Sequence, residues 1–394
     1  MVVVVVGVSA RHAVSRCSEM PPSDRRSQRS KRASIRTKAS SSSSLDDVSE
    51  QIHYVQVNAA LPNSQPTTYV RQAGSLTRTA LAPHRPSSAP YDPSRSAALA
   101  RVLAAAGNTL VDPHERDGMH PCVVPLARCP AGEIVGLLRL PKSTSVCETQ
   151  VVSMDLTTNS TYLRLLARSP DEYLHRMLAE ADASGDAGAY RAVAEAAGEY
   201  GVRLYQQGDV AASKLPTLNA YLARRVGMFL DVSEALVQAH FEKGDDMSAL
   251  ITAEWYMRDG QFPNWGKPYE YVSDLMVGRL NRREEGRDIA RLSLKTPWWT
   301  LEHGFEAARE KSGLQGDADT VIRVLQEQEE ARMSAMSTGK AFRSNEDERI
   351  DEAGHLMNKV VAGEYGQWAD IQAELVEKYE LAGLIDMARF VAMI

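Results

Sequence analysis

Two patterns of apolar residues divide the chain. Between about residues 120 and 168, short apolar and β-branched runs are separated by turn residues, which is typical of strands. After Ser169 the apolar residues recur at helical spacing almost to the C-terminus. We therefore predict a mainly α-helical protein with a small antiparallel β element at its N-terminal side.

The predicted sheet has four strands, and a short Ala- and Leu-rich helix precedes it over 94–106, closed by Gly107. The strands are Cys122–Leu126, Glu133–Leu140, Thr149–Leu156 and Tyr162–Ala167.

The helical region begins at Ser169, which can cap a helix whose first residue is Pro170 and which carries Glu172 three residues after the cap. Further helices are predicted over 189–206, 214–227, 231–243, 246–258, 270–281, 283–296, 301–312, 316–336, 346–362, 365–382 and 384–393.

A turn residue followed five positions later by a small residue recurs among these helices. The pairs are Gly208 and Ser213, Gly244 and Ala249, Asn281 and Gly286, and Gly383 and Ala388. Such spacing lets antiparallel helices pack closely, as in tetratricopeptide-type (TPR) repeats. The units lack a 34-residue period, so we predict a degenerate TPR-like helical-hairpin array.

The charge is uneven along the chain. Residues 1–90 hold 12 Lys and Arg but 5 Asp and Glu, a net charge of +7, which leaves −13 for the remainder. The basic, Ser-rich start has the composition of an organelle transit peptide, although a disordered basic tail would have the same composition. We predict a transit peptide (1–45), a disordered linker (46–93), a small α+β element (94–168) and an α-helical repeat-like domain (169–394).

Composition also excludes several classes of function. An acidic body is repelled by phosphate backbones, so we expect no nucleic-acid partner. The sequence contains no run of about 18 apolar residues, so it predicts no membrane-spanning helix. Cys122, Cys129, His114 and His120 lie close together, but their spacing matches no familiar zinc motif, so we predict no metal site and no cofactor.

The sequence shows no nucleophile elbow, dinucleotide fingerprint or zinc-protease motif, and we predict that the protein is not an enzyme. The stretch from Gly260 to Lys267 superficially resembles a phosphate-binding loop. It has one residue too many, lacks Ser or Thr after the lysine, and contains two prolines.

The most unusual feature is aromatic, since four of the five tryptophans lie within residues 255–299. Large aromatic residues either fill junctions between helices or serve as anchors at binding surfaces. We predict that Trp298 is structural and that Trp265, in a loop stiffened by Pro263 and Pro268 with Gly266 permitting the turn, is at least partly exposed. The candidate partner-binding residues are Trp255, Tyr256, Phe262, Trp265 and Tyr269.

Further distinctive segments are 121–126, 136–141, 165–176 with Glu180 and Asp182, 240–245, 248–250, 263–270, 290–291, 294–301, 383–384 and 388–390. Together these segments resemble, over about residues 95–394, the plant and algal family called "protein in chloroplast ATPase biogenesis". The blocks Pro263–Glu270 and Leu294–Leu301 are the most specific. This chain has Glu302 and His303 where the family usually shows Gly-Cys.

The resemblance implies a chloroplast stromal assembly factor that binds the gamma subunit of the ATP synthase and helps its incorporation into the catalytic core, with or after the chloroplast chaperonin. It implies no assigned binding residues. A helical scaffold for another plastid complex and an RNA-binding helical-repeat protein are the alternatives. An uncharacterised enzyme is a further one.

Overall fold

The computed structural model describes residues 94–141, 149–158, 160–258, 260–335 and 344–393. All of these residues belong to one compact unit of the chain. The predicted transit peptide (1–45) and linker (46–93) lie outside the described residues.

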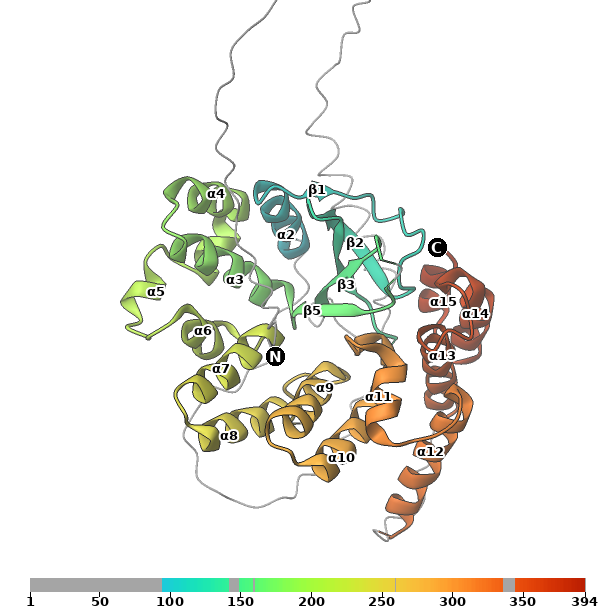
Figure 1. Cartoon of the computed structure of the whole chain (residues 1–394). Helices are drawn as coiled ribbons and strands as arrows, with labels where there is room; N and C mark the ends of the chain where they lie inside the picture. Colours follow the sequence, from blue (N-terminus) through green and yellow to red (C-terminus); the bar gives the residue numbers. More distant parts are fainter. Residues whose placement is uncertain (1–93, 142–148, 159, 259, 336–343, 394) are drawn as a thin grey trace, which may run out of the picture. The chain divides into compact units, whose positions relative to one another are not determined.

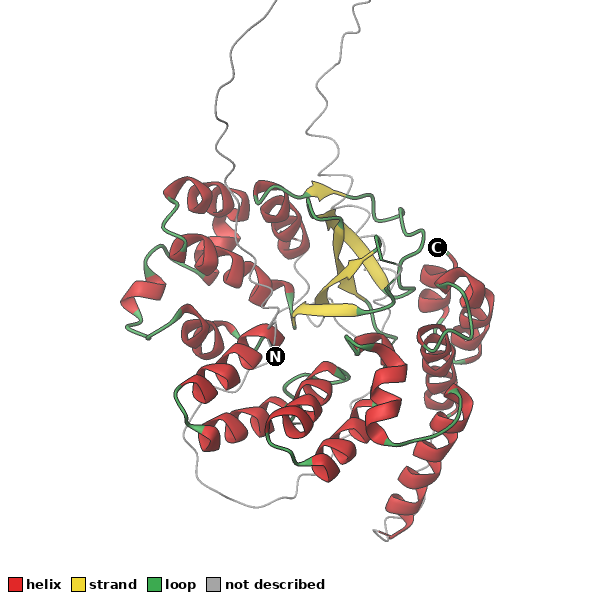
Figure 2. Ribbon diagram, viewed as in Figure 1, coloured by secondary structure: helices red, strands yellow, loops and turns green. Residues whose placement is uncertain are grey.

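The β element is an antiparallel meander whose five strands lie in chain order (Figure 1 and Figure 2). The strands are β1 (Thr109–Leu110), β2 (Val123–Arg128), β3 (Glu133–Leu138), β4 (Gln150–Asp155) and β5 (Leu163–Ala167). The four predicted strands are confirmed within two residues at each end. The two-residue β1 was not predicted, because it is too short to carry an apolar pattern.

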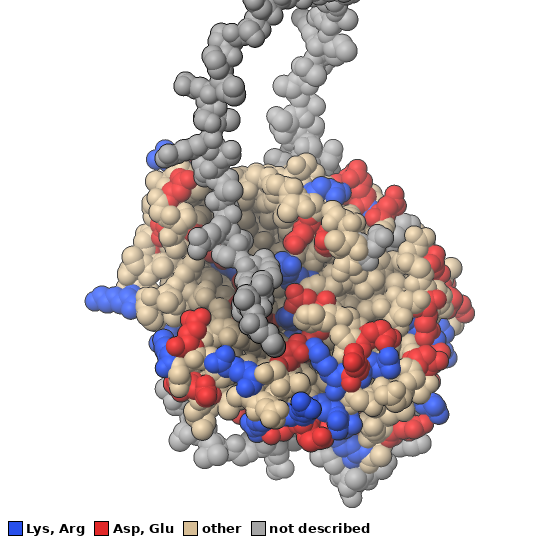
Figure 3. Space-filling view, viewed as in Figure 1, with Lys and Arg blue, Asp and Glu red and all other residues tan. Residues whose placement is uncertain are grey.

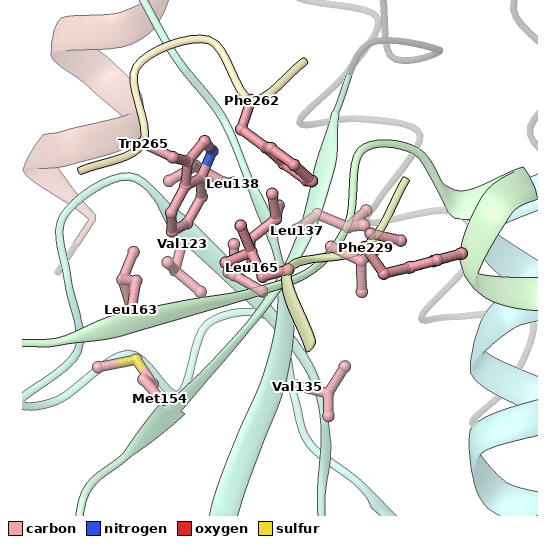
Figure 4. Packing of buried hydrophobic residues seen from close by; sticks show 14 of the residues in the cluster. Val123, Val135, Leu137, Leu138, Met154, Leu163, Leu165, Phe229, Phe262 and Trp265 are labelled. Atoms are coloured by element: carbon pink, nitrogen blue, oxygen red, sulfur yellow. The ribbon is translucent and has the colours of Figure 1, made fainter. Parts of the chain in front are cut away.

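The sheet is buried on both faces, which explains its continuous apolar strands. Five of the six residues of β2, β3 and β4 are buried in each strand. Figure 4 shows Phe229, Phe262 and Trp265, which come from outside the sheet, packed near Leu137, Leu138 and Leu165. Helices α2 and α3 also contact the strands.

Helices make up most of the rest of the described chain (Figure 2). They are α2 (Ser94–Ala105), α3 (Pro170–Ala183), α4 (Ala187–Leu204), α5 (Asp209–Ala212), α6 (Leu218–Tyr221), α7 (Leu230–Glu242), α8 (Asp246–Tyr256), α9 (Lys267–Asp274), α10 (Arg283–Ser293), α11 (Gly304–Ser312), α12 (Ala318–Ala335), α13 (Asn345–Val361), α14 (Gln372–Leu381) and α15 (Ile385–Ala392). Short π-helical turns η2 (Leu222–Val226) and η3 (Leu275–Arg279) extend α6 and α9, and 3₁₀ turns form η4 (Trp298–Thr300) and η5 (Trp368–Ile371).

The predicted start of α3 is confirmed. The hydroxyl of Ser169 accepts a hydrogen bond from the backbone N–H of Glu172 at 3.2 Å, and Pro170 is the first helical residue. The cap therefore uses one of the N–H groups that a helix start leaves without a backbone partner.

The turn-and-small-residue pattern marks real helix pairs in three of its four places. Gly244, Asn281 and Gly383 all have positive φ, and the small residues after them are buried where α8, α10 and α15 pack on the preceding helices. Gly208 also has positive φ, but it leads into the single-turn α5, and Ser213 lies just beyond that turn.

The last helix returns to the β element. Arg116 is 1% exposed and donates hydrogen bonds to the carbonyls of Val123 (3.1 Å) and Pro121 and, across 274 positions of sequence, to the carbonyl of Phe390 (2.7 Å). Its guanidinium also lies 3.9 Å from the centre of the Phe390 ring. We call this contact the Arg116–Phe390 clamp. Across the described ranges, no helix combines the length and apolar character that a membrane crossing requires.

Candidate functional site

The five candidate binding residues do not share one environment. Tyr256, Phe262 and Trp265 are buried, whereas Trp255 and Tyr269 are partly exposed. The rings of Tyr256 and Phe262 meet edge to face, with 5.3 Å between their centres. We call residues 262–268 the aromatic loop. Burial therefore separates the residues that hold this loop in place from those whose side chains are accessible.

Trp265 is a core residue, so the prediction that it is partly exposed is wrong. Its side chain is 1% exposed, and the indole N–H donates to Gln150 Oε1 on β4 at 3.0 Å. The indole also lies edge-on to Trp299, at 5.9 Å between ring centres. A loop stiffened by two prolines presses its largest side chain onto the nearby sheet rather than outward (Figure 4).

The prediction that Trp298 is structural is confirmed. Trp298 is fully buried, stacks on Phe305 with ring centres 4.1 Å apart, and donates its indole N–H to the carbonyl of Leu294 at 2.9 Å.

The turn of the aromatic loop is made by Asn264, whose φ is 65°, and not by Gly266. Gly266 has ordinary helical angles and serves a close approach instead. Its N–H donates to Thr300 Oγ1 at 2.8 Å, and an added Cβ would lie 2.5 Å from Thr296 Oγ1. Only glycine leaves room for this contact.

The two most specific blocks of the sequence, Pro263–Glu270 and Leu294–Leu301, thus pack on each other. The buried carboxylate of Glu270, one turn into α9, accepts the backbone N–H groups of Glu302 (3.0 Å) and His303 (2.9 Å). These donors precede α11 and would otherwise lack partners. His303 Nδ1 lies 3.1 Å from Glu270 Oε1.

Beside this contact lies a charged cluster, which we define as Glu234, Lys267, Glu270, Glu302 and His303. The Lys267 ammonium pairs with Glu302 and lies 3.9 Å from Glu234 Oε1. Tyr256 donates its hydroxyl proton to Glu234 Oε1 at 3.0 Å. Helices α7 and α9 and the chain before α11 therefore meet through one lysine and three carboxylates, and α8 joins them through the Tyr256 hydroxyl.

The pKa values in the charged cluster are shifted by burial and by the neighbouring charges. Burial raises the pKa of Glu234 to about 7, although Lys267 and Tyr256 oppose the shift. Burial alone would lower the pKa of Lys267, but Glu234 and Glu302 outweigh it and hold that pKa above its ordinary value. Glu302 has a pKa below its usual range: burial raises it, but the Lys267 ammonium outweighs burial.

The charged cluster joins several elements of the fold, and one side of it is accessible to solvent. The side chains of Glu302 and His303 are 42% and 53% exposed, whereas that of Lys267 is 11% exposed. Carboxylates already neutralise Lys267, the lysine that a phosphate-binding loop at Gly260 to Lys267 would use.

The roles of Glu234, Glu270 and Glu302 do not follow from the sequence. Their partners are 32 to 35 positions away or on another helix, and no local pattern encodes such distances. The one available signal is that Lys267 and Glu270 belong to Pro263–Glu270, one of the two segments most specific to the family.

The four residues weighed as zinc ligands are not gathered. His120 and Cys122 are buried, Cys129 is half-buried and His114 is exposed. His120 Nδ1 accepts the N–H of Cys122 at 3.1 Å, and the His120 ring lies between Trp299 and Trp368, 4.7 Å from each. Burial, aided by Arg116, lowers the pKa of His120 to about 3. Within the described ranges no three His, Cys, Asp or Glu side chains are grouped as metal ligands.

Trp255 lies on an exposed apolar stripe of α8. Met247, Ile251 and Trp255 are spaced four residues apart and so share one face of the helix. Met247 is 68% exposed and Ile251 is 58% exposed. We call these three residues the α8 stripe.

Comparison with known proteins gives the family. Sequence profiles described as PAB N-terminal, PAB middle domain and PAB C-terminal domain match residues 87–225, 230–317 and 324–393. "Protein IN CHLOROPLAST ATPASE BIOGENESIS, chloroplastic" of Arabidopsis thaliana is 33% identical over 295 residues, which are 74% of this chain and 84% of that protein. The chain belongs to this family. The resemblance read from the sequence motifs is therefore confirmed, and no solved structure matches.

The family's three regions correspond to parts of the fold. The charged cluster lies entirely within the PAB middle domain, Trp265 binds this domain to the sheet in the PAB N-terminal region, and the Arg116–Phe390 clamp joins that region to the PAB C-terminal domain.

Proposed function

We propose that this protein is an assembly factor for the chloroplast ATP synthase. The observation that carries the proposal is the match to a chloroplastic relative named for ATPase biogenesis, which extends over 84% of that relative. In this proposal the protein works in the chloroplast stroma, binds protein partners and catalyses no reaction.

The proposed partner is the gamma subunit, received with or after the chloroplast chaperonin and passed into the catalytic core. The central stalk of a rotary ATPase is a long helical hairpin. Until the ring of catalytic subunits closes around it, this hairpin exposes an apolar stripe. The helix pairs around Gly244, Asn281 and Gly383 would act as a TPR-like array that shields such a stripe.

Within this proposal, Trp255 and Tyr269 contact the partner, because they are the two candidates with accessible rings. Tyr256, Phe262 and Trp265 act indirectly, by fixing the loop and the start of α9. The α8 stripe supplies the apolar contact area around Trp255.

A pull-down from plastid stroma tests the proposal. We expect the full chain to retain the gamma subunit, with or without nuclease treatment. Recovery of RNA-dependent complexes, or of another plastid complex without any ATP synthase subunit, would favour an alternative function.

Trp255→Ala tests the contact residue. We expect gamma-subunit binding to weaken by about tenfold, as for an aromatic residue at the centre of an interface, with little change in thermal stability. Ile251→Ala serves as a second variant on the α8 stripe, and Glu254→Ala, on the same helix, should bind normally. Unchanged binding by Trp255→Ala would remove Trp255 from the interface.

A further inference from the structure

The PAB C-terminal domain carries an exposed apolar pair inside an acidic surface. Leu381, the last residue of α14, is 52% exposed, and Ile385, the first residue of α15, is 46% exposed. Single exposed apolar residues are common, but these two lie on either side of one tight turn at Gly383.

The start of α13 lies next to this pair. Asn345 Nδ2 donates to the carbonyl of Leu381 at 3.3 Å, and Lys378 on α14 pairs with Glu352 on α13 at 2.8 Å. The two contacts fix α13 and α14 side by side, with the first turn of α13 beside the end of α14. The exposed Glu346 and Glu348 therefore stand near Leu381.

Exposed acidic residues lie on α13 and α14, the two helices that meet beside Leu381. Residues 344–393 contain 11 Asp and Glu but 4 Lys and Arg, a net charge of −7, whereas the whole chain carries −6. Glu346, Glu348, Glu374, Glu377 and Glu380 are exposed and make no ion pair with the described residues. Figure 3 shows Asp and Glu side chains gathered where Figure 1 places α14 and α15. We call these five glutamates, together with Leu381 and Ile385, the C-terminal acidic face.

We propose that the C-terminal acidic face docks a Lys- and Arg-rich amphipathic helix of an ATP synthase subunit, with an apolar residue of that helix seated on Leu381 and Ile385. Unpaired glutamates around an apolar pair complement basic residues around an apolar anchor. A second copy of this chain would bring five more unpaired carboxylates against these five, and nucleic acid or an anionic membrane would be repelled.

This inference rests on the proposed function for the identity of the partner, and one experiment separates the two. The full chain is titrated with each purified ATP synthase subunit at about 0.05 M and about 0.3 M salt, since screening weakens exposed charge pairs. The test variant is Glu374→Lys/Glu377→Lys/Glu380→Lys. The control is Glu195→Lys/Glu199→Lys/Glu242→Lys, which reverses three exposed charges of α4 and α7 that likewise make no ion pair with any described residue.

We expect the test variant to bind one subunit at least about tenfold more weakly at low salt and to lose most of the salt dependence, while the control stays within about twofold of the wild type. Leu381→Ser should weaken the same complex at both salt concentrations. Circular dichroism melts of each variant separate a lost contact from a lost fold.

Three results would overturn the inference. If the wild type binds a subunit and the test variant binds it equally well with the same salt dependence, the surface is wrong and the proposed function stands. If neither the wild type nor the chain without residues 1–45 binds any subunit, both fail. If sedimentation shows a wild-type dimer that the test variant abolishes, a second copy of the chain occupies the face.

Discussion

At the scale of single residues, burial decides what each aromatic side chain of the middle domain does. Trp255 and Trp265 are ten positions apart, yet one is reachable from solvent and the other is sealed against the sheet. Aromatic type alone does not separate these roles, because a tryptophan serves equally well in a core and at an interface.

Trp265→Ala should destabilise the protein by about 3–5 kcal/mol, because it leaves a large cavity and removes the partner of Gln150. Urea unfolding followed by circular dichroism measures the loss. Trp255→Ala, which removes a side chain that is only partly buried, is the matched control and should cost clearly less. Equal losses for the two variants would contradict the assignment of Trp265 to the core.

Glu234→Gln should change how stability depends on pH. Because the folded pKa of Glu234 is about 7, above its ordinary value of 4.5, the folded protein holds a proton that the unfolded chain releases. The wild type therefore loses stability as the pH rises from about 4.5 to 7. Glutamine avoids this loss and can still accept from Tyr256, so the variant should gain on the order of 3 kcal/mol over wild type at pH 8 and little at pH 4.

Urea midpoints measured from pH 4 to pH 8 check this expectation, because other titrating groups cancel in the difference between the two proteins. A difference that is the same at every pH would show that Glu234 does not titrate in this range. Glu254→Gln, on the exposed face of α8, is the control and should follow the wild type.

At the scale of elements, Arg116→Met should loosen α15 from the sheet. Three carbonyls, including that of Phe390, would lose a charged donor, and each such bond contributes about 1.5–3 kcal/mol. Amide hydrogen exchange should accelerate across α14 and α15, with α7 and α8 unchanged. Uniform acceleration of exchange throughout the described chain would instead show that the chain unfolds as one cooperative unit and that the clamp does not act locally on α14 and α15.

Elements were predictable where a local pattern encodes them. The four longer strands carry apolar runs, and the start of α3 carries its own cap at Ser169, so both follow from neighbouring residues. The short α5 was missed, and α9 begins three residues before the predicted helix, because Lys267 and Pro268 form its first turn.

The site could not be predicted in the same way. The residues beside Glu270 in the sequence are those of any surface glutamate. Glu270 becomes buried and caps the start of α11 only because residues 302 and 303 approach it, and the close contact at Gly266 permits that approach. The exposure of Trp265 was misjudged for the same reason, since Gln150 lies 115 positions away.

At the scale of the whole molecule, the mature chain isolated from plastids should begin between about residues 40 and 60, where the acid-poor, Ser-rich composition ends near Asp46 and Asp47. N-terminal sequencing measures this directly. A start at Met1 or Val2 would contradict the predicted transit peptide.

The Arg116–Phe390 clamp also bears on how the chain is made. A ribosome delivers Arg116 long before Phe390, so the guanidinium, His120 and the Cys122 thiol must wait for residues 368–390 to cover them. A chain cut short before η5 would therefore not be a smaller working protein. Such a chain would expose apolar surface and the Cys122 thiol, which chaperones and proteases can recognise. Burial of these groups through the clamp therefore distinguishes a completely synthesised chain from a truncated one.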